Sequence, residues 1–287
     1  MGVMKLLGIS LLLALFASVA VAQPRGNPCG GKPRPPDPCG GMPMPPRPPP
    51  PPRPQADPAK TYSIRIDVED AVDGAADAKI TIVDLSDYAC PWCEKIRPTL
   101  AELKAKYGKD LRIVYKQFIV HPSTATAGAL AACAANRQHK FAEVDAALWE
   151  AYKANKLDKD ANGTKCWQTK EGCPNANAAA RDAKLDLGKF TADMTQCEGI
   201  VKASMAEMTA FGVNAIPQFW INGRSLVGGQ PIASFTAIID DELRKADARI
   251  KAGTKPDRYY QQWVVDKGEK KLAAPPVRPS DPCGGGL

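Results

Sequence analysis

Two cysteines, with two residues between them, stand where a predicted strand is followed by a predicted helix. An almost unbroken apolar run covers residues 80–85, as expected of a central strand with both faces buried. After Cys90-Pro91-Trp92-Cys93, apolar side chains recur at helical spacing until Gly108, at Ile96, Leu100, Leu103 and Tyr107. A third element, residues 111–115, alternates like a strand, so the chain is predicted to have an α/β fold.

The place of this motif at the start of a helix favours redox chemistry. Cys90 would be the N-cap and Pro91 the first helical residue, where a missing N–H costs nothing. Unpaired N–H groups and the helix dipole would stabilise a Cys90 thiolate, which is the form that attacks a disulfide. Cys93, one turn further along, would then be the resolving thiol.

Two structural roles for the cysteine pair compete with this interpretation. A zinc site would need a second pair at matched spacing, but Cys166 and Cys173 stand far along the chain, which has only two histidines. An inert disulfide bridge is the other alternative. We therefore predict a redox couple with no metal and no cofactor.

Helices and a hairpin are predicted after the third strand. Residues 123–207 are rich in alanine and have helical spacing, with a polar loop at 155–177. Strands at 218–221 and 225–227 flank Asn222-Gly223, a turn signal typical of hairpins.

Strand and helix signals also flank this region. Ahead of the motif, apolar and polar residues alternate, which predicts a strand with Tyr62, Ile64, Ile66 and Val68 on its buried face. A last helix is predicted to begin near Pro231.

Residues 1–22 have the pattern of a cleaved export signal. Lys5 precedes an apolar run over 6–21, and Ala20-Val21-Ala22 is a small-residue cleavage site. A retained membrane anchor is the alternative, but the apolar run is shorter than the ~20 residues of a membrane span. We therefore expect a periplasmic or secreted protein, in a compartment where disulfides persist.

Residues 23–60 are predicted to be an extended, disordered arm, because they contain 16 of the 27 prolines. The arm also holds six Lys and Arg against two Asp, so much of the net charge of +7 belongs to it. It could be a spacer, or a basic segment attracted to an anionic envelope surface. Nothing resembles a basic stripe with interleaved aromatic residues, and no nucleic-acid partner is expected.

One five-residue unit, Pro-Cys-Gly-Gly preceded by Asn or Asp, occurs three times in the predicted tails. Its cysteines are Cys29 and Cys39 in the arm and Cys283 in the tail 273–287. These thiols could form disulfides with one another or with another molecule, or have no defined role. Capture of a soft metal is a further alternative, since Met42 and Met44 follow Cys39.

Residues 61–252 resemble the DsbA-like branch of the thioredoxin superfamily. The resemblance implies a thioredoxin fold in a domain at 61–272, with a helical domain inserted at about 123–207 and a disordered tail on either side. The matching residues are the stretch Ile82 to Cys93, His121-Pro122, Lys140-Phe141 and the stretch Phe211 to Arg224.

The resemblance also implies roles for individual residues. Cys90 would form the mixed disulfide with substrate, and Ile216-Pro217 would be a cis peptide that faces the two sulfurs. Pro91, Trp92, Ile216 and Pro217 are thus the predicted substrate-binding residues.

Asp84 is predicted to be a third catalytic residue. It shares strand parity with Ile80 and Ile82, so it should point into an apolar layer, where burial would raise its pKa. A carboxyl there could relay a proton from Cys93, and the family often has an acid at this position. The alternative is a solvated aspartate at the end of the strand.

The chain departs from the family pattern in two places. Pro-Trp replaces the Pro-His of the strongest oxidases, which predicts a less oxidising couple because tryptophan adds no positive charge. Gln117-Phe118-Ile119 replaces the more usual His-Phe-Pro. His121 is interpreted as structural rather than as a catalytic base.

Four further cysteines are candidates for structural disulfides. Cys166 and Cys173 bracket a loop that a local bridge would hold in place. Cys133 and Cys197 could bridge within the helical domain, or could be free buried thiols.

These features predict a thiol-disulfide oxidoreductase acting on cysteines of exported proteins. Disulfide donation is favoured over isomerase or reductase activity, and a monomeric core is expected. Family analogy adds a membrane redox partner, either a quinone-linked oxidant or an electron donor. The alternative is a thiol-rich tethering or metal-capturing protein that acts through its Pro-Cys-Gly-Gly tails.

Overall fold

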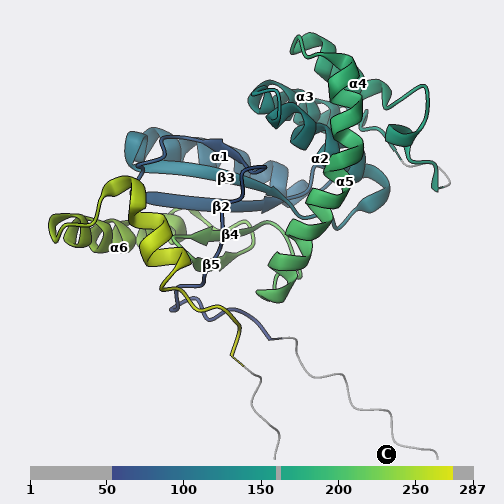
Figure 1. Ribbon diagram of the computed structural model, residues 1–287. Coiled ribbons are helices and arrows are strands. Elements are labelled where there is room, and N and C mark those ends of the chain that lie inside the picture. The colour runs from purple at the N-terminus through teal and green to yellow at the C-terminus, as the bar shows by residue number, and fades with distance from the viewer. Residues whose placement is uncertain (1–53, 160–162, 274–287) are drawn as a thin grey trace, which may run out of the picture. The chain divides into compact units, whose positions relative to one another are not determined.

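Five strands form one mixed sheet at the centre of the molecule (Figure 1). The computed structural model describes residues 54–159 and 163–273. The strand order is β1-β3-β2-β4-β5; β2 and β3 are parallel, and the other neighbouring pairs are antiparallel. The bounds are β1 Ala71–Asp73, β2 Ile80–Ser86, β3 Leu111–Gln117, β4 Gln218–Ile221 and β5 Arg224–Val227. The predicted α/β class and the hairpin are confirmed.

Two helices cover one face of this sheet. α1 (Pro91–Tyr107) is the crossover that two parallel strands require, and α6 (Ile232–Lys251) follows β5. Their apolar stripes meet alternate residues of the strands, so each side contributes one layer of a common core. Its buried members include Ile80, Ile82, Ile96, Leu100, Ile113, Phe219, Phe235 and Ile239.

The opposite face is covered by irregular segments and by the C-terminal part of helix α5 (Leu187–Ala210), and here one prediction is wrong. Residues 62–68 form no strand: Tyr62 makes an isolated parallel bridge with Glu269, and Val68 is 95% exposed. Tyr62 and Ile64 are buried as the alternation predicts. The Tyr62 N–H nevertheless donates to the Gly223 carbonyl, and the Ser63 N–H donates to the Glu269 carbonyl. The backbone of this segment therefore bonds to the hairpin turn and to the C-terminal segment.

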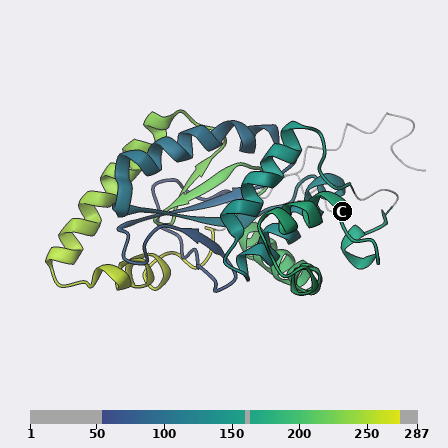
Figure 2. The same ribbon diagram turned by 90° about the horizontal axis from the view of Figure 1, so that it is seen from above.

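Four helices follow β3 and return the chain to β4, as the family resemblance implies. Figure 2 shows them gathered at one end of the sheet. Small alanines let these helices approach closely around a separate buried cluster, which also includes both motif cysteines. The helices are α2 Pro122–Asn136, α3 Phe141–Lys153, α4 Pro174–Asp182 and α5 Leu187–Ala210.

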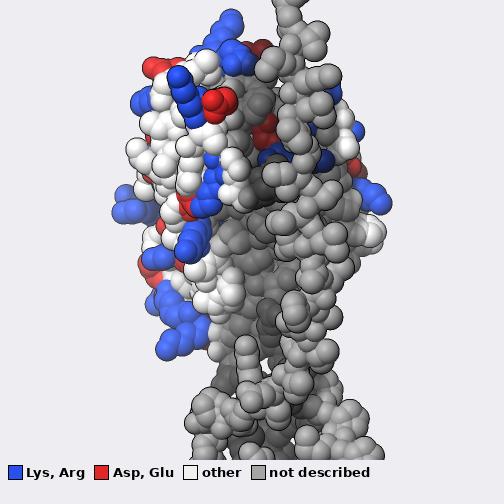
Figure 3. Space-filling model, turned by 90° about the vertical axis from the view of Figure 1, so that its right-hand side faces the viewer, with Lys and Arg blue, Asp and Glu red and all other residues white. Residues whose placement is uncertain are grey.

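None of the helices in the described part of the chain is long and apolar enough to span a membrane. The predicted export signal with its cleavage site at Ala22, most of the proline-rich arm, and the tail cysteines Cys29, Cys39 and Cys283 lie outside the described residues. On the face shown in Figure 3, Lys and Arg side chains are interspersed with Asp and Glu.

Candidate active site

The motif cysteines lie at the N-terminus of α1. Cys90 is the N-cap, with extended backbone angles of φ −91° and ψ 118°, and Pro91 is the first helical residue. The Cys90 N–H donates to the Asp87 carbonyl at 3.0 Å, which closes the turn between β2 and the helix. Both cysteines are free thiols, 4% exposed at Cys90 and 1% at Cys93. Two free thiols therefore lie at the positive end of a helix, with Cys93 the deeper one.

A buried carboxylate holds the loop before the motif in place. Asp87 is fully buried and accepts hydrogen bonds from the Ala89 N–H at 2.7 Å and from the Val120 and His121 N–H groups at 2.8 Å. The His121 ring nitrogen Nδ1 also lies 3.2 Å from this carboxylate. Asp87 thus fixes the segment after β3 against the loop that carries Cys90, and His121 is part of this support.

The tryptophan between the two cysteines lies on the surface. Trp92 is 58% exposed, and the Lys95 ammonium lies 4.6 Å from its ring centroid. A Cβ on Gly229 would be 3.9 Å from the ring, so Trp92 also lies beside the turn after β5. In that turn the Gly228 N–H donates to the Pro217 carbonyl at 2.8 Å. This turn therefore connects Trp92 to the loop that carries Pro217.

The Ile216–Pro217 peptide is cis in the structure. Ile216 packs against the buried cluster that contains Cys90 and Cys93. Of the residues predicted to bind substrate, Pro91 and Trp92 thus lie in the motif and Ile216 packs against its surroundings, while Pro217 bonds to the turn beside Trp92. Their role in binding remains a prediction.

Asp84 lines a cavity of about 320 Å³ between the sheet and α1, and Cys93 and Gln117 line it too. Asp84 lies on the central strand β2, in register with Tyr115 on one side and Phe219 on the other. Its Oδ1 atom and the Gln117 Oε1 atom are buried with no hydrogen-bond partner among the described residues. A polar cavity of this size can hold water between such groups.

Burial beside this cavity raises the pKa values of the Asp84 carboxyl and the Cys93 thiol. Burial and, less strongly, the nearby Asp145 carboxylate raise the pKa of Asp84, the Arg97 guanidinium lowers it, and the net value is about 7. Burial likewise raises the pKa of the Cys93 thiol, and the charges of Cys90 and Asp84 add to that rise. A Cys93 thiolate therefore forms with difficulty unless a neighbouring group accepts or supplies its proton.

Several residues around the site were not predicted from the sequence. Asp145 of α3 accepts hydrogen bonds from the Tyr88 hydroxyl at 2.8 Å, the Trp149 indole at 3.1 Å and the Arg97 guanidinium at 3.0 Å. Two spacings could have indicated them, because Arg97 follows Cys93 by one helical turn and Trp149 follows Asp145 by one turn.

A close helix contact brings Tyr88 to this network. A Cβ on Gly128 of α2 would lie 3.2 Å from the Tyr88 ring, so glycine allows the ring to approach the helix backbone. The ring also packs against Trp149, with a centroid separation of 4.9 Å. The loop before Cys90 is therefore packed directly against the inserted helices.

Two disulfides stabilise the helical insertion. Cys133 of α2 is bonded to Cys197 of α5, with a Cα separation of 6.1 Å. Cys166 is bonded to Cys173 across the loop before α4, with a Cα separation of 4.9 Å. The structure therefore has the pairings that the sequence suggested, rather than free thiols.

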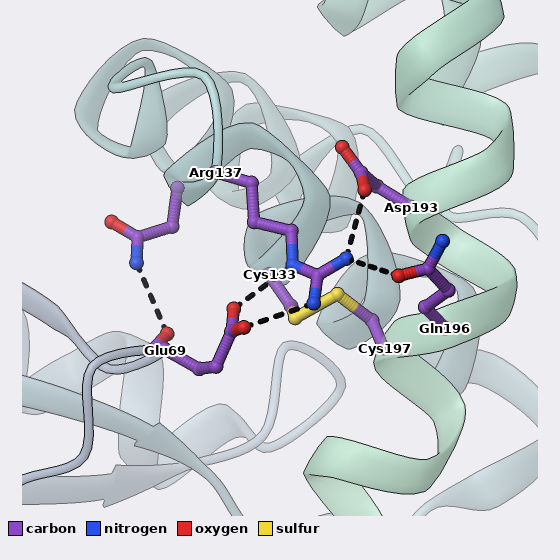
Figure 4. Close-up of a disulfide and its surroundings, with 7 residues drawn as sticks. Glu69, Cys133, Arg137, Asp193, Gln196 and Cys197 are labelled. Atoms are coloured by element: carbon purple, nitrogen blue, oxygen red, sulfur yellow. Dashed lines mark hydrogen bonds and ion pairs between the residues drawn. A yellow bond between two sulfur atoms is a disulfide. The ribbon is translucent and has the colours of Figure 1, made fainter.

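An arginine beside the first of these disulfides links the insertion to the sheet (Figure 4). Arg137, just after α2, forms two hydrogen bonds with the carboxylate of Glu69, which precedes β1, both at 2.9 Å. The same guanidinium donates to Asp193 and Gln196 of α5, both at 2.8 Å. The C-terminal end of α2 and the bonded part of α5 are thus held against the segment that leads into the sheet.

The described residues contain no group of three or more His, Cys, Asp or Glu side chains placed to hold a metal ion. Metal capture by the tail cysteines concerns residues outside the described part, so it remains an alternative from the sequence alone.

Comparison with solved structures supports the fold. Wolbachia pipientis alpha-DsbA1 is similar, with a TM-score of 0.51 and 16% sequence identity, over 64% of this chain and 96% of that chain. At this identity the similarity concerns the fold alone.

Two curated relatives are Na(+)/H(+) antiporters. NhaA of Herminiimonas arsenicoxydans is 25% identical over 177 residues, and NhaA 3 of Salinispora tropica is 26% identical over 196 residues. The matches cover 61% and 66% of this chain but 26% and 27% of those relatives. The chain therefore spans about a quarter of the length of the curated relatives it matches.

The family comparison covers most of the domain described above. The family model Thioredoxin_4, described as Thioredoxin, matches residues 67–241, from the segment before β1 to the middle of α6. This range includes the cysteine motif, the helical insertion and the cis-proline loop, and it is more than half of the chain. The chain belongs to the thioredoxin family Thioredoxin_4.

Proposed function

We propose that this chain is an exported thiol-disulfide oxidoreductase that exchanges a disulfide between Cys90-Cys93 and cysteines of periplasmic or secreted proteins. The observation that carries the proposal is the cysteine pair at the N-terminus of α1, with Asp84 and Cys93 lining one polar cavity. An inert bridge would need neither a surface-exposed neighbour such as Trp92 nor a buried acid behind its second sulfur.

In the donating direction, a substrate thiolate attacks the Cys90 sulfur of the oxidised pair. The bond between the Cys90 and Cys93 sulfurs breaks, and the electron pair leaves on Cys93. Protonated Asp84, whose pKa is about 7, can supply the proton that the buried Cys93 thiolate takes up. A second substrate thiolate then attacks the mixed disulfide, which releases an oxidised substrate and a reduced enzyme.

Donation is the proposed direction, with isomerase activity second and reductase activity third. The DsbA-like family supports donation, whereas Trp92 in place of histidine supports a less oxidising couple than a Pro-His enzyme. A membrane redox partner, such as a quinone-linked oxidant, would reoxidise Cys90-Cys93. Pro91, Trp92, Ile216 and Pro217 would contact the substrate on either side of the Cys90 sulfur.

The reduction potential of the Cys90-Cys93 pair tests the proposal. The mature chain is equilibrated in glutathione buffers and alkylated with a mass tag, so that peptide mapping reads this pair separately from the other cysteines. A value near about −120 mV supports a disulfide donor, and one near about −270 mV a reductase. A Cys90→Ala/Cys93→Ala variant is the control, and absence of a reversible two-electron transition would refute redox function.

A tethering function remains the second candidate, and one contact favours it. The Glu269 N–H donates to the Thr61 carbonyl and the Ser63 N–H to the Glu269 carbonyl, both at 2.9 Å. These bonds hold the beginning and the end of the described domain together, so both tails are joined to it at one place. Deleting residues 23–53 and 274–287 discriminates, because an enzyme keeps dithiol exchange whereas a tether loses its partner or metal.

A further inference from the structure

The helical insertion contributes a charged group to the wall of the redox cavity. Asp145 of α3 lines the same cavity as Asp84 and Cys93, and its side chain is 13% exposed. Both of its carboxylate oxygens are engaged, Oδ1 by Tyr88 and Trp149 and Oδ2 by Arg97. The side chain is therefore fixed in position and cannot turn away to solvent.

Its partner Arg97 comes from the opposite wall. Arg97 lies on α1, one turn after Cys93, and its guanidinium stacks 5.0 Å from the Trp149 ring centroid. The ion pair thus joins the helix that carries the cysteines to the inserted domain. Because an arginine can make this contact both by charge and by stacking, the pair is firmly placed.

The two charges act on Asp84 in opposite directions. The Asp145 carboxylate raises the pKa of Asp84, and the Arg97 guanidinium lowers it. Other groups that face the cavity are Lys104 and Asp73, which are paired at its rim, together with Cys93 and Tyr115. Of these cavity-lining charges, Asp145 and Arg97 are the two that change the pKa of Asp84.

We propose that Asp145 and Arg97 are a positioning pair for disulfide exchange: together they fix the electric field at the Asp84 carboxyl and tie the inserted helices to the redox centre. The proposal rests on the proposed function, because it concerns the proton that Asp84 passes to Cys93. Asp145 and Arg97 touch neither sulfur nor substrate in this role. They act through Asp84.

The test is the titration of the Asp84 carboxyl in the full chain, followed by carbon-detected NMR and assigned with an Asp84→Asn variant. Asp145→Asn keeps an oxygen that can accept from Tyr88 and Trp149 but removes the charge, so the Asp84 titration should move to lower pH. Arg97→Gln should move it to higher pH, and Arg97→Lys should restore it towards the wild-type position. The double variant Asp145→Asn/Arg97→Gln should lie between the two single variants.

Kinetics are measured on the same proteins, as the pH dependence of reduction of Cys90-Cys93 by a dithiol. The rate profile should move with the Asp84 titration in both single variants. Asp182→Asn, at the exposed end of α4, is the matched control and should change neither measurement.

Opposite shifts of the two single variants, with matching rate profiles, support the proposal. Shifts in the same direction, or no shift, would show that the ion pair is only structural and would overturn it, whatever the rates do. If the titration moves but the rate profile does not, the link to exchange is overturned. Absence of exchange in the wild type would instead refute the proposed function, and the NMR titration would still decide the electrostatic claim.

Discussion

Replacing Asp84 by asparagine should stabilise the reduced protein, and more so as the pH rises. A carboxyl on an internal strand must be desolvated when the protein folds, and no hydrogen bond to Oδ1 offsets that cost. Asparagine has a similar shape and no charge to desolvate. The difference between the two proteins should therefore report the ionisation of Asp84.

The size and sign follow from the pKa values. Burial raises the pKa of Asp84 from 3.8 to about 7, so between these values the folded protein binds a proton that the unfolded chain has released. The stability that this proton provides is fully present below pH 3.8 and is lost as the pH rises through 7. At about 1.4 kcal/mol for each pH unit, the wild type loses roughly 4 kcal/mol that the variant keeps.

Urea unfolding of both proteins between pH 4 and 8.5, with a reductant that leaves the two structural disulfides intact, measures this difference. The free energy of unfolding of Asp84→Asn minus that of the wild type should increase by roughly 4 kcal/mol across the range and level off above about pH 7. Asp182→Asn, on the surface, should show no such slope. A flat difference for Asp84→Asn would mean that Asp84 is not desolvated, and the proton relay would lose its physical basis.

Three further predictions concern the disulfides and the surface tryptophan. Removing the Cys133–Cys197 bridge, which closes 64 residues, should lower the free energy of unfolding by roughly 4 kcal/mol in urea titrations of the double serine variant. The Cys166–Cys173 bridge closes a loop with a sequence separation of only 7, so its removal should lower the free energy of unfolding by roughly 2 kcal/mol. Equal losses for the two bridges would contradict the idea that they stabilise by reducing the entropy of the unfolded chain. Trp92→Ala should slow mixed-disulfide formation with a cysteine peptide, measured by stopped-flow fluorescence. It should change the free energy of unfolding by less than about 0.5 kcal/mol, because the Trp92 side chain is 58% exposed. A loss of stability with unchanged kinetics would argue for a packing role.

The sequence predicted those parts of the site in which neighbouring residues determine the geometry. The place of Cys90 at a helix N-terminus follows from the strand before it and from Pro91 after it. The burial of Asp84 follows from strand parity with Ile80 and Ile82, since side chains on one strand alternate between faces. Local pattern was sufficient in both cases.

Features that depend on contacts between distant segments were missed. Local spacing links Asp145 to Trp149 and Arg97 to Cys93, but nothing in the sequence of either helix shows that Asp145 meets Arg97. The alternation from Tyr62 to Val68 indicated burial correctly at Tyr62 but not the strand, because the backbone there bonds to Gly223 and Glu269. Hydrogen-bond partners this far apart in the sequence are determined by the folded structure and not by the local residue pattern.

Residues near the two ends of the described domain, Pro54 and Leu272, both lie against Gly212. Gly212 has a φ of +82°, and a Cβ there would lie 2.8 Å from the Pro54 carbonyl oxygen and 2.9 Å from the Leu272 side chain. Only four residues separate Gly212 from the cis proline at 217. A pulling force on either tail would therefore act beside the turn that leads into the Pro217 loop, so a protein held by its tails would carry the load next to its cis peptide.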